Sequence, residues 1–167
     1  MRRTEKNSCK RLYAWVLFVF AALSAPAWAM DQPVMSMGQT VYVPVYSNVF
    51  SGPKANPFQL AAMVSIRNTD PKDSITILRA DYYDNEGRMI ESHMKEAKKL
   101  GPLASTHIYI KEYDTKGGPG ANFIIQWQAK GLVNEPIIET LMLGLKGGQG
   151  ISFMCPAKVI EARKQKE

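Results

Sequence analysis

The stretch ITILRADYYDNEGRMIESH, residues 75–93, decides how this chain folds. Its first nine residues are rich in β-branched and aromatic side chains, which favour a strand. Asp84–Gly87 then brings turn-forming residues together, and Gly87 can adopt the positive φ that tight hairpins use. Arg88–His93 resumes an extended pattern. The stretch therefore predicts two antiparallel strands joined by a short turn.

Alternating segments lie on both sides of this hairpin. Gln59–Arg67 carries an apolar residue at every second position, and in Asn122–Ala129 the same period aligns Phe123, Ile125 and Trp127. A period of two predicts strands with one buried face, so we expect Trp127 to lie in the core. The remaining predicted strands are Thr40–Tyr46, Ser105–Lys111, Pro136–Leu145, Ile151–Cys155 and Lys158–Ala162.

Two connecting segments have a different composition. Ser47–Pro57 contains Gly52 and two prolines, which predicts a loop. Met94–Leu100 is followed directly by Gly101 and a proline, which is typical of a helix end, so we expect one or two helical turns there.

About seven to eight short strands with turn residues at near-regular spacing predict an all-β fold. The chain has 167 residues, 46% apolar and 22% charged, which is a globular composition and enough length for one domain. Pro44 within the first strand fits a sheet edge. We therefore expect a single antiparallel β-sandwich of the immunoglobulin-like kind over residues 40–162.

The first 29 residues have the three-part layout of a secretory signal peptide: a basic start, an apolar run and the cleavage motif Ala27-Trp28-Ala29. We expect cleavage near Ala29 and a periplasmic or secreted protein without a stable membrane span. Cleavage removes five Lys and Arg residues and one Glu, so the formal net charge falls from +6 to +2. That small charge argues against nucleic acid as a partner. Residues 30–39 are predicted as a flexible arm and 163–167 as a basic tail.

Six stretches of the mature chain form a set: residues 67–71 (RNTDP), 81–84 (DYYD), 102–105 (PLAS), 117–123 (GGPGANF), 133–136 (VNEP) and 149–153 (QGISF). Together they resemble a bacterial exported family known as domain of unknown function 3124. The resemblance spans about residues 40–160. It implies a small exported bacterial domain, and it brings no activity, substrate, cofactor or catalytic residue with it.

Strand reversal makes one prediction about a binding site. Consecutive antiparallel strands place alternate loops at the same end, and one end collects Ser47–Pro57, Asp84–Gly87, Glu112–Ala121 and Lys146–Gln149. Loops on a rigid scaffold are common binding sites. The candidate residues at this loop end are Asp84, Glu86, Asp114, Lys116, Gly117, Gly118, Gly120 and Asn122.

We expect a non-enzymatic binding or accessory module without a cofactor, whose partner is a protein or glycan of the cell envelope. Two alternatives stay open. Thioether ligands select Cu(I) and imidazole also binds copper, so Met35, Met37 and His93 could serve a copper carrier. A hydrolase could use His93 or His107, and Cys155 is the one thiol that remains after cleavage, although no catalytic signature surrounds it. We expect Cys155 to be a small buried apolar residue.

Overall fold

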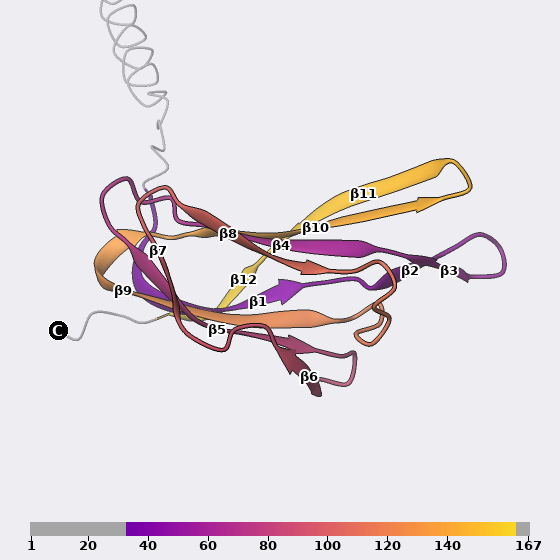
Figure 1. Ribbon diagram of the computed structural model, residues 1–167, viewed down its shortest axis with the longest axis horizontal. Helices are drawn as coiled ribbons and strands as arrows, with labels where there is room; N and C mark the ends of the chain where they lie inside the picture. The colour runs from indigo at the N-terminus through magenta and orange to yellow at the C-terminus, as the bar shows by residue number, and fades with distance from the viewer. Residues whose placement is uncertain (1–32, 163–167) are drawn as a thin grey trace, which may run out of the picture. The chain divides into compact units, whose positions relative to one another are not determined.

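The computed structural model describes residues 33–162, so the predictions for residues 1–32 and 163–167 lie outside the described part (Figure 1). Residues 33–162 form twelve strands and no helix, arranged as two antiparallel sheets and a separate hairpin. The predicted all-β antiparallel sandwich is confirmed, with more strands than the sequence analysis expected.

The first sheet has the strand order β12-β1-β9-β5-β6, and β7 pairs with β5 on the same edge as β6. Its strands are β1 (Met35–Pro44), β5 (Ile75–Tyr83), β6 (Met89–Ser92), β7 (Lys98–Leu100), β9 (Asn122–Asn134) and β12 (Lys158–Ala162). Central β9 is the longest strand, and its C-terminal part curves toward the second sheet (Figure 1).

The second sheet has the order β11-β10-β4-β8. Its strands are β4 (Ala61–Arg67), β8 (Ser105–Ile110), β10 (Ile137–Lys146) and β11 (Gln149–Pro156). A separate hairpin joins β2 (Asn48–Ser51) to β3 (Asn56–Gln59). This hairpin and β10–β11 extend beyond the ends of the other strands (Figure 1). They touch near Gly144, where an added Cβ would lie 2.6 Å from Cε1 of Phe58.

The core lies between the facing surfaces of the two sheets. Trp127 is fully buried, and in the first sheet it lies between Gln39 of β1 and Ile77 of β5. Phe123 and Ile125 are also fully buried on the same face of β9. The predicted burial of Trp127 is confirmed, because the period of two in β9 directs these three side chains inward.

Three local predictions are wrong. Ser47–Pro57 is not an irregular loop, because positive φ values at Gly52 and Ala55 allow a tight turn between β2 and β3. The end of Met94–Leu100 is not helical, because Lys98–Leu100 pairs with the start of β5. Residues 35–39 of the predicted arm belong instead to β1, which begins at Met35 and pairs with the end of β9.

Candidate functional site

The four loops that were predicted to share one end do lie at the same end of the sheets (Figure 1). Hydrogen bonds join them. The Gly120 N–H donates to Oδ1 of Asn85 at 2.7 Å, the Ser47 N–H donates to the Gly118 carbonyl at 3.1 Å, and Lys146 Nζ donates to the Pro57 carbonyl at 3.4 Å. Sequence reasoning therefore located the loop end correctly, although its role as a binding site stays a prediction.

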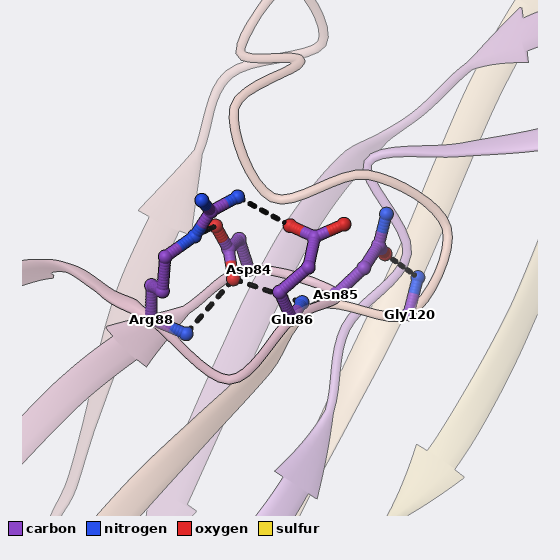
Figure 2. A network of polar contacts seen from close by, with 5 residues as sticks. All are labelled: Asp84, Asn85, Glu86, Arg88 and Gly120. Atoms are coloured by element: carbon purple, nitrogen blue, oxygen red, sulfur yellow. Dashed lines mark hydrogen bonds and ion pairs between the residues drawn. The ribbon is translucent and has the colours of Figure 1, made fainter.

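The turn between β5 and β6 uses its polar groups internally (Figure 2). Asp84 Oδ1 accepts the backbone N–H groups of Glu86 and Arg88, both at 2.9 Å. The Arg88 guanidinium pairs with Asp84 at 3.0 Å and with Glu86 at 2.6 Å. The Arg88 N–H and guanidinium lower the pKa of the Asp84 carboxyl, so the turn carries a stable negative charge that Arg88 neutralises.

The glycine-rich loop before β9 is fitted against this turn and against Tyr82. A Cβ added at Gly117 would lie 2.1 Å from the Tyr82 hydroxyl, and one added at Gly118 would lie 2.5 Å from Nδ2 of Asn85. Gly118 also has a φ of +74°, which glycine adopts without strain. The Tyr82 hydroxyl lies 3.1 Å from the Ser47 hydroxyl, and burial raises its pKa. The loop is therefore a tightly packed turn.

The other candidates at this end differ in their freedom to bind. Asn122 is buried and pairs with Pro44 and Tyr83 in the first sheet. Asp114 accepts the backbone N–H of Lys116 at 3.1 Å, and both residues are exposed or half-buried in the loop. Only Asp114 and Lys116 among the predicted residues combine surface position with side chains that form no ion pair in the part described.

The structure does not bring the proposed copper ligands together. Met35 pairs with Asn134 at one end of β9, whereas the His93 ring packs against Phe123 at the other end, with a ring distance of 5.2 Å. Met37 lies two residues after Met35 in β1, near the same end of β9, so neither methionine reaches His93. That ligand set is therefore wrong. Within residues 33–162, no three His, Cys, Asp or Glu side chains form a metal-binding group.

The residues named for a hydrolase are also separated. His107 pairs with Ser65, and Cys155 pairs with Thr140, which is buried on the inner face of the same sheet. Because the register continues across β4, His107 and Cys155 lie on opposite faces. Partial burial raises the pKa of the Cys155 thiol, which keeps the thiol protonated.

At the opposite end, sequence reasoning missed a cluster of hydrogen bonds made by the side chains of Asn68 and Asp70, both of which are buried. Asp70 accepts three backbone N–H groups, from Lys72, Asp73 and Asn134, at 2.9–3.0 Å. Asn68 Nδ2 donates to the Asp73 and Gly101 carbonyls, both at 2.8 Å. These contacts join the loop after β4 to the turn before β8 and to the end of β9, where three of the six stretches quoted above meet.

The second missed feature is an apolar outer face on the second sheet. The register aligns Tyr109, Met63, Leu141 and Met154 in one row across β8, β4, β10 and β11. Leu143 and Leu145 continue this side of β10, because alternate residues share a face. We call these six side chains the apolar face; Tyr109 is 58% exposed, Leu145 78% and Met154 62%. The alternation of apolar residues in β10 and β11 can be seen in the sequence. The row across four strands forms only when those strands pair.

The charges of this sheet lie outside the apolar face. Arg67 and Glu139 form an ion pair at 3.9 Å toward the other end of β4 and β10, on the same outer side. The six residues of the apolar face carry no charge, and the exposed Lys111, two residues after Tyr109, follows the end of β8 toward the loop end. Within residues 33–162, no helix has the length and apolar character to cross a membrane.

Comparisons with known proteins give one family. No curated protein matches the sequence significantly. A solved structure from Thermotoga maritima, described as "Crystal Structure of Thermotoga maritima 1070", is similar over 75% of this chain and 97% of that chain, with 10% identity and a TM-score of 0.46. The model of the family described as "Protein of unknown function (DUF3124)" matches residues 38–160, from β1 into β12. The chain therefore belongs to the DUF3124 family.

Proposed function

We propose that this chain is an exported, non-enzymatic binding module that docks a protein partner on its apolar face. The observation that carries the proposal is the uncharged row of apolar side chains across four strands, in which Tyr109, Leu143, Leu145 and Met154 are exposed while Met63 and Leu141 are half-buried. Contiguous exposed apolar surface is uncommon on monomeric proteins and marks interaction sites. Export rests on the layout of residues 1–29.

The chemistry of the face favours a protein over a glycan. Leu143, Leu145 and Met154 offer no hydrogen-bonding side chain for sugar hydroxyls, and methionine adapts its shape to varied apolar partners. Tyr109, at the β8 edge, adds an aromatic ring with a polar tip, which is a type of residue enriched at protein interfaces. A partner with a neutral, apolar contact surface fits this arrangement.

The adjacent edge strand extends the same surface. β11 is the terminal strand of its sheet and contains no Asp, Glu, Lys or Arg. Natural sheet edges usually carry charges that discourage further pairing. An uncharged edge beside an apolar face suits a partner that adds an extended segment to β11 and covers Met154. Behind it, Phe58 of the β2–β3 hairpin supports β10 at Gly144.

Matched lysine substitutions in β10 test the proposal. Leu143 and Ile137 lie on the same strand and the same face, with exposures of 46% and 50%, but only Leu143 belongs to the apolar face. Proteins captured by the wild type from envelope extracts after cross-linking are identified and purified, and their affinities are then measured with each variant. We expect Leu143→Lys to weaken binding about tenfold or more, because it places a charge in the interface core. Ile137→Lys should bind as the wild type does.

Two controls make the result decisive. Thermal melts of both variants should match the wild type, since both positions are exposed. Sedimentation of the purified wild type shows whether the partner is a second copy, because a dimer that Leu143→Lys dissociates and Ile137→Lys preserves would identify it. Equal affinities of Leu143→Lys and Ile137→Lys for the captured partner would refute docking on the apolar face.

A further inference from the structure

We infer that a cavity on the first sheet, far from the apolar face, binds the phosphate group of an anionic ligand. Its volume is about 390 Å³. The wall residues that carry the inference are Lys72, Ser74, Thr76, Lys99, Lys130 and Gly131. They come from the β4–β5 loop, β5, β7 and β9, so the fold brings together residues that are up to 59 positions apart in the sequence.

An irregularity in β9 creates the cavity. Gly38 of β1 pairs with Gln128, but Ser36 already pairs with Val133, so residues 129–132 of β9 stand opposite Met37 alone. The extra residues bulge away from β1, as expected for a bulge that carries more residues than its partner strand. Gly38 permits this close crossing, because a Cβ there would lie 2.7 Å from the Trp127 carbonyl. The bulge places Lys130 and Gly131 at the cavity.

The walls carry an excess of positive charge. Three lysines and one aspartate, Asp73, line the cavity. None of Lys72, Lys99 and Lys130 forms an ion pair with a residue in 33–162. Asp70 accepts three backbone N–H groups and still attracts Lys72, so its negative charge offsets part of the lysine charge. Lys99 and Lys130 carry the charges that remain available to a ligand.

One wall is held in place before any ligand binds. Asp70 ties the backbone of Lys72 and Asp73 to the end of β9, and Asn68 holds the Asp73 carbonyl from the other side. A wall fixed in this way loses little conformational entropy on binding. The hydrogen bonds of Asn68 and Asp70 thus acquire a role, since they fix the backbone of Lys72 and Asp73 in the cavity wall next to Ser74.

The charge and the donors match a phosphate group. A phosphate monoester carries about −1.5 to −2 at neutral pH, and the three lysines and one aspartate that line the cavity have a formal charge of +2, which the neighbouring Asp70 lowers. Lysine is a common phosphate ligand that acts as a point charge. The Ser74 and Thr76 hydroxyls add neutral donors. The group can belong to a soluble phosphate ester or to the headgroup of an anionic lipid.

Titration of the purified full chain with inorganic phosphate tests the site. Amide shifts are followed by NMR against chloride at equal ionic strength, because chloride controls for screening. We expect saturable shifts at Ser74, Thr76 and Gly131 with phosphate. The variant Lys99→Gln plus Lys130→Gln should bind about tenfold more weakly for each lysine removed.

A control variant lowers the net charge by the same amount as Lys99→Gln plus Lys130→Gln. Lys54→Gln plus Lys98→Gln removes two lysines that do not line the cavity, one of them adjacent to Lys99, and should bind phosphate as the wild type does. Glycerol phosphate and vesicles of phosphatidylglycerol or phosphatidylcholine then assign the source. Affinity for the free ester indicates a soluble ligand, and co-sedimentation with phosphatidylglycerol alone indicates a lipid headgroup. Identical shifts with phosphate and chloride, or equal affinities of the two double variants, would overturn the inference.

Discussion

At the scale of single residues, backbone groups determine the positions of most polar side chains at both ends of the fold. Asp84 and Asp70 each accept two or three backbone N–H groups, while Asn85 and Asn68 bridge to distant segments. Short polar side chains serve this purpose because they reach neighbouring backbone groups without long flexible stems. Their role at these positions is to shape loops.

Alanine variants at Gly118 and Gly148 distinguish two costs of adding a methyl group, the backbone penalty of a positive φ and steric contact with a neighbour. Both have positive φ, +74° and +78°, so each alanine variant pays a similar backbone penalty of about 1 kcal/mol. Gly118→Ala also forces its Cβ against Asn85 at 2.5 Å, whereas nothing lies within 4 Å at Gly148. Urea unfolding should therefore show a larger loss of stability for Gly118→Ala. Equal losses would mean that Asn85 moves aside freely.

Asp70 predicts a pH dependence of stability. The backbone N–H of Asp73, followed by those of Lys72 and Asn134, lowers its pKa below the ordinary value of 3.8. A lowered pKa in the folded state adds stability above the unfolded pKa, and that stability disappears as the pH falls through the folded pKa. We expect Asp70→Asn to be less stable than the wild type at pH 7 and the gap to narrow below about pH 4. Urea melts at several pH values measure it, and a gap independent of pH would contradict this cause.

At the scale of elements, hairpins project from the sheets and interrupted pairing shapes the surface. β6 and β7 share one edge of β5, and the segment between them is anchored where the His93 N–H donates to the Ala80 carbonyl at 2.9 Å. In β9, the bulge at residues 129–132 interrupts the pairing with β1, although Ala129 still pairs with Ile75 of β5, and Ala129, Lys130 and Gly131 line the cavity. Both surface features therefore arise where strands stop pairing regularly.

The turn between β5 and β6 predicts an order of stability losses. Arg88 is 74% exposed, and exposed ion pairs add little stability. Asp84 instead satisfies two backbone N–H groups of the turn. We expect Asp84→Ala to lower the melting temperature clearly more than Arg88→Ala. The reverse order in calorimetry would show that the ion pairs, rather than the turn hydrogen bonds, hold this hairpin.

At the scale of the whole molecule, the two sheets meet through a core centred on β9. Trp127 is its largest fully buried side chain. Truncation of a buried aromatic residue removes about 3–5 kcal/mol, a large part of a total stability of about 5–15 kcal/mol. Trp127→Ala should therefore unfold at much lower urea concentration. A cost below about 1 kcal/mol would show that the sheets collapse around the vacated space.

The signal-peptide layout predicts the first residue of the mature chain. The motif Ala27-Trp28-Ala29 should be followed by cleavage, so exported material starts at Met30. Trp127 is then the only tryptophan, and its fluorescence should have the blue-shifted maximum of a buried indole. N-terminal sequencing and emission spectra measure both. An intact Met1 in exported material would contradict the cleavage.

The sequence by itself determined most of the long strands and their faces. The predicted bounds of β5 and β12 agree with the structure, and Phe123, Ile125 and Trp127 point inward, because a local period of two directs side chains without reference to the rest of the chain. Strand reversal also located the loop end. These properties depend only on neighbours in the sequence, so a single chain read in order contains them.

Only the tertiary structure decided which surfaces these strands build. Lys72, Lys99 and Lys130 meet at one cavity, and Tyr109 aligns with Met154 across two intervening strands. β7 forms where helical turns were expected, since pairing with Ile75–Ile77 outweighs a weak local preference. Such contacts depend on strand order and register between distant segments. Their free energy appears only when the sheets pair and pack, so no local pattern records it.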